Sequence, residues 1–173
     1  DQAKLYCQSR SADHEIFDGS APDLRLEALR PAIEGTCPVY IHAEGAREIR
    51  AAVEWALGAK LRPVIVGGRE APRVASFLAE YKVPVVYGPV HRLPSSRDDA
   101  YDDPFTGPAK LAAAGVDFCI GAFDTSNVRN LPYHAATAAA YGLSPEKALE
   151  SITLAPARIF GVADRYGSLA RGK

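Results

Sequence analysis

Four short apolar runs, each followed by a segment with helical spacing, constrain the fold of this chain more than any other feature. The runs predict β-strands over Val39–His42, Pro63–Val66, Val83–Tyr87 and Val116–Gly121. Because they are apolar throughout rather than alternating, they indicate a parallel sheet that is covered on both faces. Successive βα units usually pair with their neighbours, so we expect the four strands to lie parallel and adjacent in chain order.

The segments between these apolar runs have the residue spacing that is typical of helices. The spacing of apolar residues predicts helices over residues 46–58, 71–81, 108–114 and 130–141. Ser144 followed by Pro145 is typical of a helix start, because serine caps the first turn and proline suits it. We also expect one helix over residues 24–33 and a long loop, rich in Pro, Arg and Asp, over residues 88–106. Residues 1–22 show no pattern that predicts an element.

Two architectures fit four βα units in succession, a doubly wound sheet and a (β/α)₈ barrel. Four strands are too few to close a barrel, so a barrel would require further strands upstream of Asp1. The chain of 173 residues contains no methionine, and we therefore do not expect Asp1 to be a natural start. Composition and periodicity leave both architectures open.

The charge balance argues against several classes of partner. Lysine and arginine total 20 and aspartate and glutamate total 21, without a basic run, so the footprint of a nucleic-acid or membrane-surface binder is missing. No apolar stretch is long enough for a membrane span, and no signal-peptide pattern opens the chain. We expect a soluble protein, with the cytoplasm, the periplasm and secretion all left open.

The cysteines also argue against two kinds of structural site. Cys7, Cys37 and Cys119 form no CxxC pair, which argues against a disulfide framework or a zinc knuckle. Cys119 lies within a predicted strand, where we expect a small buried thiol.

Two glycine motifs do not support a nucleotide site. Gly67-Gly68 follows a predicted strand, but no GxGxxG accompanies it. Residues 167–173 match GxxxxGK, yet the polar residues 164–166 precede them where a phosphate-binding loop would need a strand. Neither a GxSxG nucleophile motif nor an HExxH zinc motif is present.

Polar residues at the carboxyl ends of parallel strands are the candidates for chemistry in either architecture. Three predicted strands lead into such residues: His42-Ala43-Glu44, His91-Arg92 and Asp124-Thr125-Ser126-Asn127. Each has a structural alternative, because a lone histidine such as His42 is often structural, Asp124 could cap the next helix, and His91 could simply be solvated. His134 in a helix and His14 in the unassigned segment are expected to be structural or exposed.

The last third of the chain carries a long composite pattern. It consists of Gly142-Leu143-Ser144, residues 148–162 (ALESITLAPARIFGV), residues 164–169 (DRYGSL) and Gly172-Lys173. With this pattern the chain resembles the amidohydrolase superfamily, in its imidazolonepropionase-like branch. Residues 38–43 and 130–136 fit the same branch, so the resemblance covers about residues 26–173.

The resemblance implies an α/β fold that is the C-terminal portion of a (β/α)₈ TIM-type barrel. Residues 1–173 would then form a single partial domain that contains barrel strands five to eight with their helices and is truncated at both ends. The last residues would begin the return to a small β domain.

The resemblance also implies a hydrolase that acts on carbon–nitrogen bonds of amides or cyclic amides in a small-molecule substrate. In the family, strand five ends in a histidine metal ligand and strand eight in an aspartate that binds metal and handles protons; by position these are His42 and Asp124. A divalent ion, expected to be zinc, would activate a water and polarise the substrate carbonyl. Asp124 would orient that water and carry its proton to the leaving nitrogen. The residues expected to shape substrate specificity are His91, Arg92, Arg97 and Asn127.

The chain departs from the family pattern at strand six, where Gly68 stands in place of a histidine ligand. The HxH ligands of strand one would lie upstream of Asp1. We therefore expect His42 and Asp124 to converge on a site for one ion at most, and the chain by itself to lack hydrolase activity. A non-catalytic, metal-free homologue that serves as a binding or structural protein is the alternative, and exposed strand edges make a homo-oligomer possible.

Overall fold

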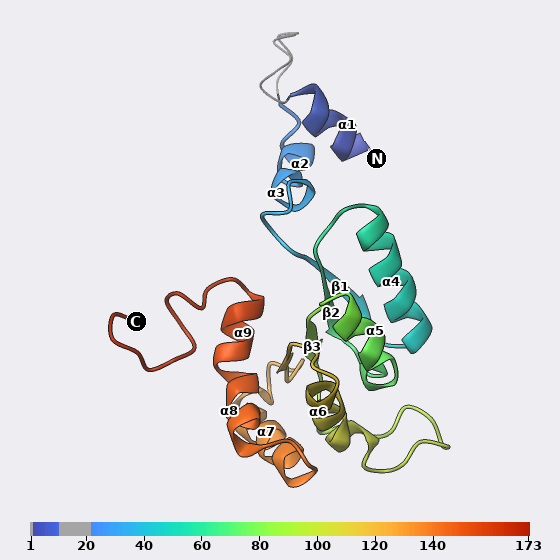
Figure 1. The fold of residues 1–173 in the computed structure, drawn as a ribbon, viewed down its shortest axis with the longest axis vertical. Helices are drawn as coiled ribbons and strands as arrows, with labels where there is room; N and C mark the ends of the chain where they lie inside the picture. Colours follow the sequence, from blue (N-terminus) through green and yellow to red (C-terminus); the bar gives the residue numbers. More distant parts are fainter. Residues whose placement is uncertain (1, 11–21) are drawn as a thin grey trace.

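A four-stranded parallel sheet forms the centre of the computed structural model, which describes residues 2–10 and 22–173. Its strands are β1 (Val39–Ala43), β2 (Pro63–Gly67), β3 (Val85–Tyr87) and β4 (Phe118–Ile120). They pair in the order β1-β2-β3-β4, all parallel, which confirms the predicted order and direction (Figure 1). The last two strands are shorter than predicted, because the paired residues run only from 85 to 87 and from 118 to 120.

Helices follow the strands in the predicted order, but where the spacing predicts one helix over residues 71–81 the structure has a 3₁₀ turn and a shorter helix. Their bounds are α4 (Ala46–Gly58), the 3₁₀ turn η1 (Ala71–Val74), α5 (Ala75–Glu80), α6 (Asp103–Ala113), η2 (Val128–Asn130), α7 (Leu131–Ala140), α8 (Pro145–Ile152) and α9 (Leu154–Ile159). The helix over residues 46–58 has the predicted bounds. Ser144 caps α8 by accepting a hydrogen bond from the Lys147 backbone N–H at 3.2 Å, as expected for serine at this position.

The segment 24–33 forms two short helices, α2 (Leu24–Glu27) and α3 (Arg30–Ile33), and the prediction of a single helix was wrong. Pro31 explains the interruption, since it has no N–H to donate to the carbonyl of Glu27. These helices lie beside α1 (Gln2–Ser9), apart from the sheet (Figure 1). His14 lies outside the described residues.

Helix α6 begins at Asp103, five residues before the predicted start, although Pro108 lies inside it. Proline at this position cannot donate to the carbonyl of Pro104, four residues earlier. That carbonyl instead accepts a hydrogen bond from the Tyr87 hydroxyl at 3.1 Å, and Tyr87 is completely buried. Gly107 makes room for the hydroxyl, because a Cβ there would lie 2.2 Å from it. A side chain from β3 thus replaces the missing helical hydrogen bond.

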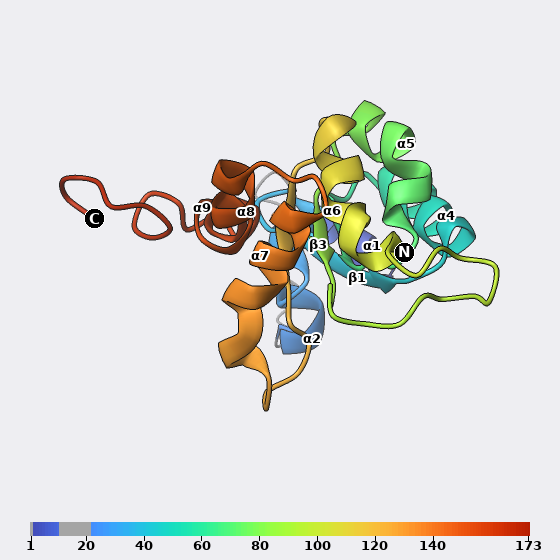
Figure 2. The same cartoon turned by 90° about the horizontal axis from the view of Figure 1, so that it is seen from below.

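One face of the sheet packs against the helices α4 to α7. The main core cluster joins strand residues such as Ile65 and Val85 to Val53 of α4, Leu78 of α5 and Leu111 of α6, all with 0% exposure. Figure 2 shows α4, α5 and α6 grouped together. Ala148 of α8 also belongs to the main cluster, so within the described residues only α9 packs on the opposite face. This core fixes the strands from which the candidate site residues extend.

The opposite face, here called the α9 face, carries Tyr40, His42, Val64, Val66, Val86 and Cys119. Ala155 and Ile159 of α9 pack against Val64, Val86 and Cys119 in a second, smaller cluster. Cys119 is buried as predicted, and burial raises the pKa of its thiol to about 12. Tyr40 donates to the Ile159 carbonyl at 3.3 Å and stacks on Phe160, so the segment 159–160 reaches the amino-end half of β1.

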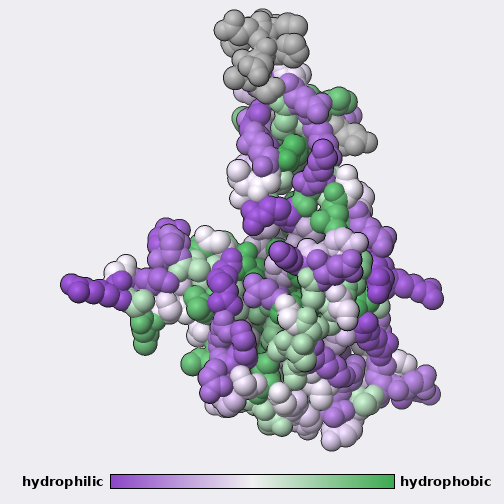
Figure 3. All heavy atoms as spheres, viewed as in Figure 1, coloured by the Kyte–Doolittle hydropathy of each residue, from purple (hydrophilic) through white to green (hydrophobic). Residues whose placement is uncertain are grey.

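The surface in Figure 3 is largely hydrophilic around the N-terminal helices and the C-terminal tail, and apolar residues show near the centre of this view. The described residues after α9 contain no strand, so the expected return to a β domain stays a prediction. Among the described residues, no helix combines the length and the apolar character that crossing a membrane would need.

The Tyr87–Pro104 hydrogen bond gives a test of this packing. Tyr87→Phe should lower the free energy of unfolding by about 1–3 kcal/mol, because it leaves a buried carbonyl without a donor. Tyr81→Phe, at a half-exposed position on the outside of α5, is the matched control and should change stability by less than about 0.5 kcal/mol. Urea unfolding measures both values; equal stability of the two variants would contradict the proposed role of the hydroxyl.

Candidate functional site

The loops that follow β1, β2, β3 and β4 all leave the sheet at one edge, here called the carboxyl edge. Backbone contacts hold three of these loops close together: Gly88 N–H donates to the Gly67 carbonyl at 3.2 Å, and Gly121 N–H donates to the Tyr87 carbonyl at 2.8 Å. A Cβ at Gly88 would lie 2.2 Å from the Gly121 carbonyl oxygen, and φ of Gly88 is +145°. Glycine is therefore required for this close approach.

His42 lies at the carboxyl end of β1 on the α9 face, paired in register with Val66. Its side chain is 66% exposed, so it does not pack into the sheet. Its Nε2 is 3.5 Å from Oε1 of Glu44, the only ion-pair partner of His42 in the part of the chain that the structure describes. The position on an open face leaves Nδ1 without a protein partner there, which is compatible with a ligand role.

Glu44 connects the first loop to the second. Its Oε2 accepts a hydrogen bond from the Arg69 backbone N–H at 3.0 Å. The carboxylate lies over Gly67, where a Cβ would be 2.6 Å from Oε1. Glu48 fixes the turn from the other side by accepting from the backbone N–H groups of Gly45 and Glu44, which lower the pKa of its carboxyl.

Gly67 and Gly68, at the end of β2 where the family pattern has a histidine, have little room for a side chain. Gly68 has φ of +60°, and a Cβ there would lie 2.9 Å from a methyl of Val85 and 3.3 Å from Cβ of Ala71, both in the main core. A side chain at Gly67 would collide with Glu44. A side chain at Gly68 would therefore be strained and would press on the core, whereas one at Gly67, where φ is +91°, would be strained and would require Glu44 to move.

Asp124 lies in the exposed loop after β4 and accepts hydrogen bonds from residues that follow it. Oδ1 accepts from the Ser126 backbone N–H at 2.8 Å, and Oδ2 accepts from the side-chain amide of Asn127. The Asn127 amide, followed by the Ser126 N–H, holds the pKa of the Asp124 carboxyl below its usual range. Asp124 and His42 make no hydrogen bond or ion pair with each other within the described residues, so their convergence stays a prediction.

The long loop between β3 and α6 spans residues 88–102 and carries the predicted specificity residues. Arg92 turns back toward the sheet and donates to the Arg69 carbonyl at 3.0 Å and to the Tyr87 hydroxyl at 3.3 Å. Arg97 is exposed and has no ion-pair partner in the described part of the chain. Asp99 accepts from Arg73 of η1, which ties the loop to the preceding βα unit. Arg92 thus anchors the loop, and a contact with substrate stays a prediction.

His134 on α7 is buried, with 4% exposure, and meets the beginning of the same loop. Its Nδ1 accepts from the backbone N–H of Val90 at 3.1 Å and from that of His91 at 3.4 Å. The His91 and His134 rings stack with centroids 4.2 Å apart. Of the two predicted alternatives for His134, structural or exposed, the structural one is confirmed. His91 is exposed, as expected for a residue of a polar loop.

The described residues contain no group of three or more His, Cys, Asp or Glu side chains placed to hold a metal ion. A catalytic zinc usually has three protein ligands. His42 and Asp124 alone therefore do not make a complete metal site.

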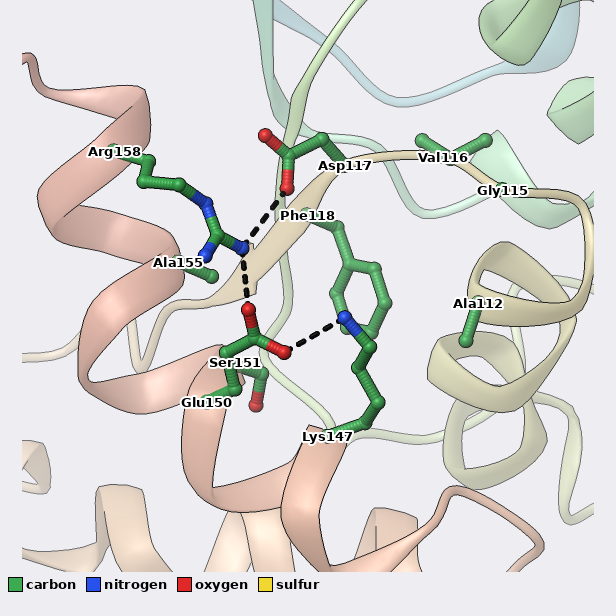
Figure 4. Close-up of a pocket in the computed structure, with 10 residues that line it drawn as sticks. All are labelled: Ala112, Gly115, Val116, Asp117, Phe118, Lys147, Glu150, Ser151, Ala155 and Arg158. Carbon is green, nitrogen blue, oxygen red and sulfur yellow. Dashed lines mark hydrogen bonds and ion pairs between the residues drawn. The ribbon is translucent and has the colours of Figure 1, made fainter.

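Two cavities of the described chain lie at the amino ends of the strands, away from the carboxyl edge. A pocket of about 330 Å³ opens beside Asp117 and Phe118, at the amino end of β4 (Figure 4). Its charged residues pair with one another: Glu150 accepts from Lys147 and Arg158, and Arg158 also lies 3.6 Å from Asp117. Lys147, followed by Arg158, lowers the pKa of the Glu150 carboxyl. The pocket is thus a neutralised junction between β4, α8 and α9 rather than a site for a charged ligand.

Sequence reasoning named Glu44 and His134 but assigned neither of them a contact at the carboxyl edge. Glu44 had a signal, since it follows His42 by two residues at a strand end. His134 had a weaker one, a single histidine in an alanine-rich helix. Neither pattern states which loop the side chain contacts, because both contacts join segments 25 or more residues apart.

No protein-family model and no curated protein sequence matches this chain. Among solved structures, the chain is similar to an amidohydrolase from Thermotoga maritima MSB8, with a TM-score of 0.83 and 30% sequence identity over 99% of this chain. It covers 45% of that protein, so it spans less than half of the relative's length. A second structure, of an uncharacterized protein, matches with a TM-score of 0.63 and 20% identity over 83% of this chain and 38% of that one, which supports the fold alone. The chain therefore has an amidohydrolase-like fold.

Proposed function

We propose that this chain forms part of a metal-dependent hydrolase that cleaves carbon–nitrogen bonds in amides or cyclic amides. The observation that carries the proposal is the position of His42, which extends from the carboxyl end of β1 on an open face of a sheet like that of the Thermotoga maritima amidohydrolase. The imidazolonepropionase-like branch and the completion of the sheet into a (β/α)₈ barrel belong to the same proposal. Both rest on the sequence pattern and on the length of that relative.

His42 and Asp124 would supply two ligands to one divalent ion, expected to be zinc, and the remaining ligands would come from other parts of a longer protein. When bound, such an ion lowers the pKa of a coordinated water and polarises a carbonyl. Gly67 and Gly68 support a single ion, since neither has a side chain that could bind a second one and both have a backbone conformation that side chains rarely adopt.

Asp124 would act as the proton acceptor of the reaction. Its carboxyl has a lowered pKa, so it is ionised at neutral pH and its oxygens are free of protons. Because a lowered pKa also makes the carboxylate a weaker base, proton transfer to it would depend on a bound ion that makes the water more acidic. Asn127 would hold the carboxylate in place, and the loop 88–102 would contact the substrate through His91 and Arg97. Arg92 would keep that loop against Tyr87 and Arg69.

A metal-free binding protein of the same fold is the second candidate. It is favoured by one observation, Gly68 in the place of the strand-six histidine, where a Cβ would lie 2.9 Å from a methyl of Val85. The two proposals differ in metal content and in turnover, and one experiment separates them.

The test uses a longer protein that contains this chain together with the rest of the sheet. We expect one zinc per chain by elemental analysis and hydrolysis of an amide or cyclic amide. Asp124→Asn should lower kcat by about 10²- to 10⁴-fold, the usual contribution of an acid–base group, and His42→Ala should lower the metal content. Glu80→Gln, an exposed change on α5, should alter neither. A metal-free protein without turnover would contradict the hydrolase proposal and leave the binding alternative.

The 173-residue chain alone should show no chelator-sensitive hydrolysis, because its described residues provide at most two ligands where a catalytic zinc usually needs three. Turnover by the purified chain that is abolished by a chelator would contradict this expectation.

The hydrogen bond from Asn127 gives a prediction that needs no metal. Asn127→Ala should raise the pKa of the Asp124 carboxyl toward the ordinary aspartate value, because the largest stabilising contact of the carboxylate is lost. Carboxyl carbon NMR shifts followed through a pH titration measure this change. Asn130→Ala is the control, since Asn130 contacts Asn127 at 3.4 Å and not Asp124; equal Asp124 pKa values in both variants would show that Asn127 has no such role.

A further inference from the structure

His134 is a buried polar side chain to which the proposed function gives no role. It lies on α7, yet its Nδ1 accepts hydrogen bonds from two backbone N–H groups of the β3–α6 loop, those of Val90 and His91. An imidazole nitrogen accepts a hydrogen bond only when it carries no proton. The contact therefore requires neutral His134, with its proton on Nε2.

His91 strengthens the same junction from the loop side. Its ring stacks on His134 with an angle of 25° between the planes, and its Nε2 lies 2.8 Å from the Thr137 hydroxyl, one turn further along α7. Two residues of the loop, Val90 and His91, are thus fixed to one helix. Arg92 follows directly and anchors to Arg69 and Tyr87, so the junction sets where the long loop begins.

Few charges act on His134. Burial, followed by the neighbouring His91, lowers its pKa. On the elements packed against α7, Lys110 of α6 pairs with Asp103, Lys147 of α8 pairs with Glu150, and Arg129 of η2 is exposed. Within the described residues, no carboxylate contacts the ring to stabilise its charged form.

We propose that His134 is a positioning residue, whose neutral imidazole fixes the start of the β3–α6 loop at the carboxyl edge and whose protonation releases that loop. Protonated Nδ1 would face two N–H donors and could accept from neither. The contact is complete above the ordinary histidine pKa of about 6.5. It is lost as the pH falls through the pKa of His134 in the folded chain, which is lower than the ordinary value. The contact itself is independent of the proposed hydrolase function; only its consequence for substrate binding rests on that function.

Hydrogen exchange of the Val90 and His91 amides, measured by NMR at about pH 7.5 and pH 4.5 and corrected for intrinsic exchange, tests the proposal. In the unaltered chain their protection should fall about tenfold on acidification, as expected for the loss of one hydrogen bond. In His134→Asn the side-chain oxygen can take the place of Nδ1 and does not titrate, so protection should change by less than about twofold. The Gly68 amide, which donates to the Ala43 carbonyl, is the internal control and should stay protected throughout.

His134→Leu introduces an apolar side chain of similar bulk that has no hydrogen-bond acceptor. The amides of Val90 and His91 should therefore be unprotected at both pH values. If this variant unfolds, which loss of Gly68 protection would reveal, the comparison between the unaltered chain and His134→Asn decides alone. Equal protection of the unaltered chain at both pH values, or an equal fall in His134→Asn, would overturn the proposal. A chain without hydrolase activity would leave these results unchanged, so failure of the proposed function and failure of this inference are distinguishable.

Discussion

Four strands that run in the same direction send every following loop to one edge of the sheet, and each feature of the candidate site depends on this constraint. The strands keep their alignment because one face packs on α4 to α7, while α9 covers part of the other. His42 and Asp124 come from the two outer strands of this sheet. A sheet that curves toward a barrel would bring such outer strand ends toward each other, whereas a flat one would keep them apart.

The first three loops at the carboxyl edge are joined to neighbouring segments by side chains, whereas Asp124 in the fourth loop accepts hydrogen bonds from Ser126 and Asn127 of its own loop. Glu44 of the first loop accepts from the Arg69 N–H of the second, and Glu70 of the second accepts from the Ala46 N–H of the first at 2.9 Å. Asp99 joins the third loop to Arg73, and His134 joins it to α7. A change in any one loop is therefore expected to reach the next.

Local patterns were sufficient to predict the elements that a single segment specifies. Apolar runs located all four strands, and the helix over residues 46–58 has the bounds that its periodicity predicts. The single helix predicted over 24–33 was wrong because Pro31 interrupts the backbone hydrogen bonds. The start of α6 was missed because Tyr87, 17 residues earlier, satisfies the carbonyl that Pro108 leaves free.

In the candidate site, too, the sequence predicted what a single segment specifies and did not predict the contacts between segments. The strand-end positions of His42 and Asp124 could be predicted, since they follow from the chain order of strands and polar residues. The contacts of Glu44, Arg92 and His134 could not, because each joins different βα units and depends on how closely Gly67 and Gly88 let the loops approach. Sequence reasoning therefore located candidates for the chemistry but not the contacts that position them.

The proposed hydrolase function requires that His42 and Asp124 bind one metal ion at the carboxyl edge. Anomalous X-ray diffraction at the zinc edge, from crystals of a longer protein that contains this chain, tests it most directly. We expect a single peak about 2.0–2.2 Å from an imidazole nitrogen of His42 and from a carboxylate oxygen of Asp124. A peak bound by other residues only, or two peaks at this edge, would contradict it.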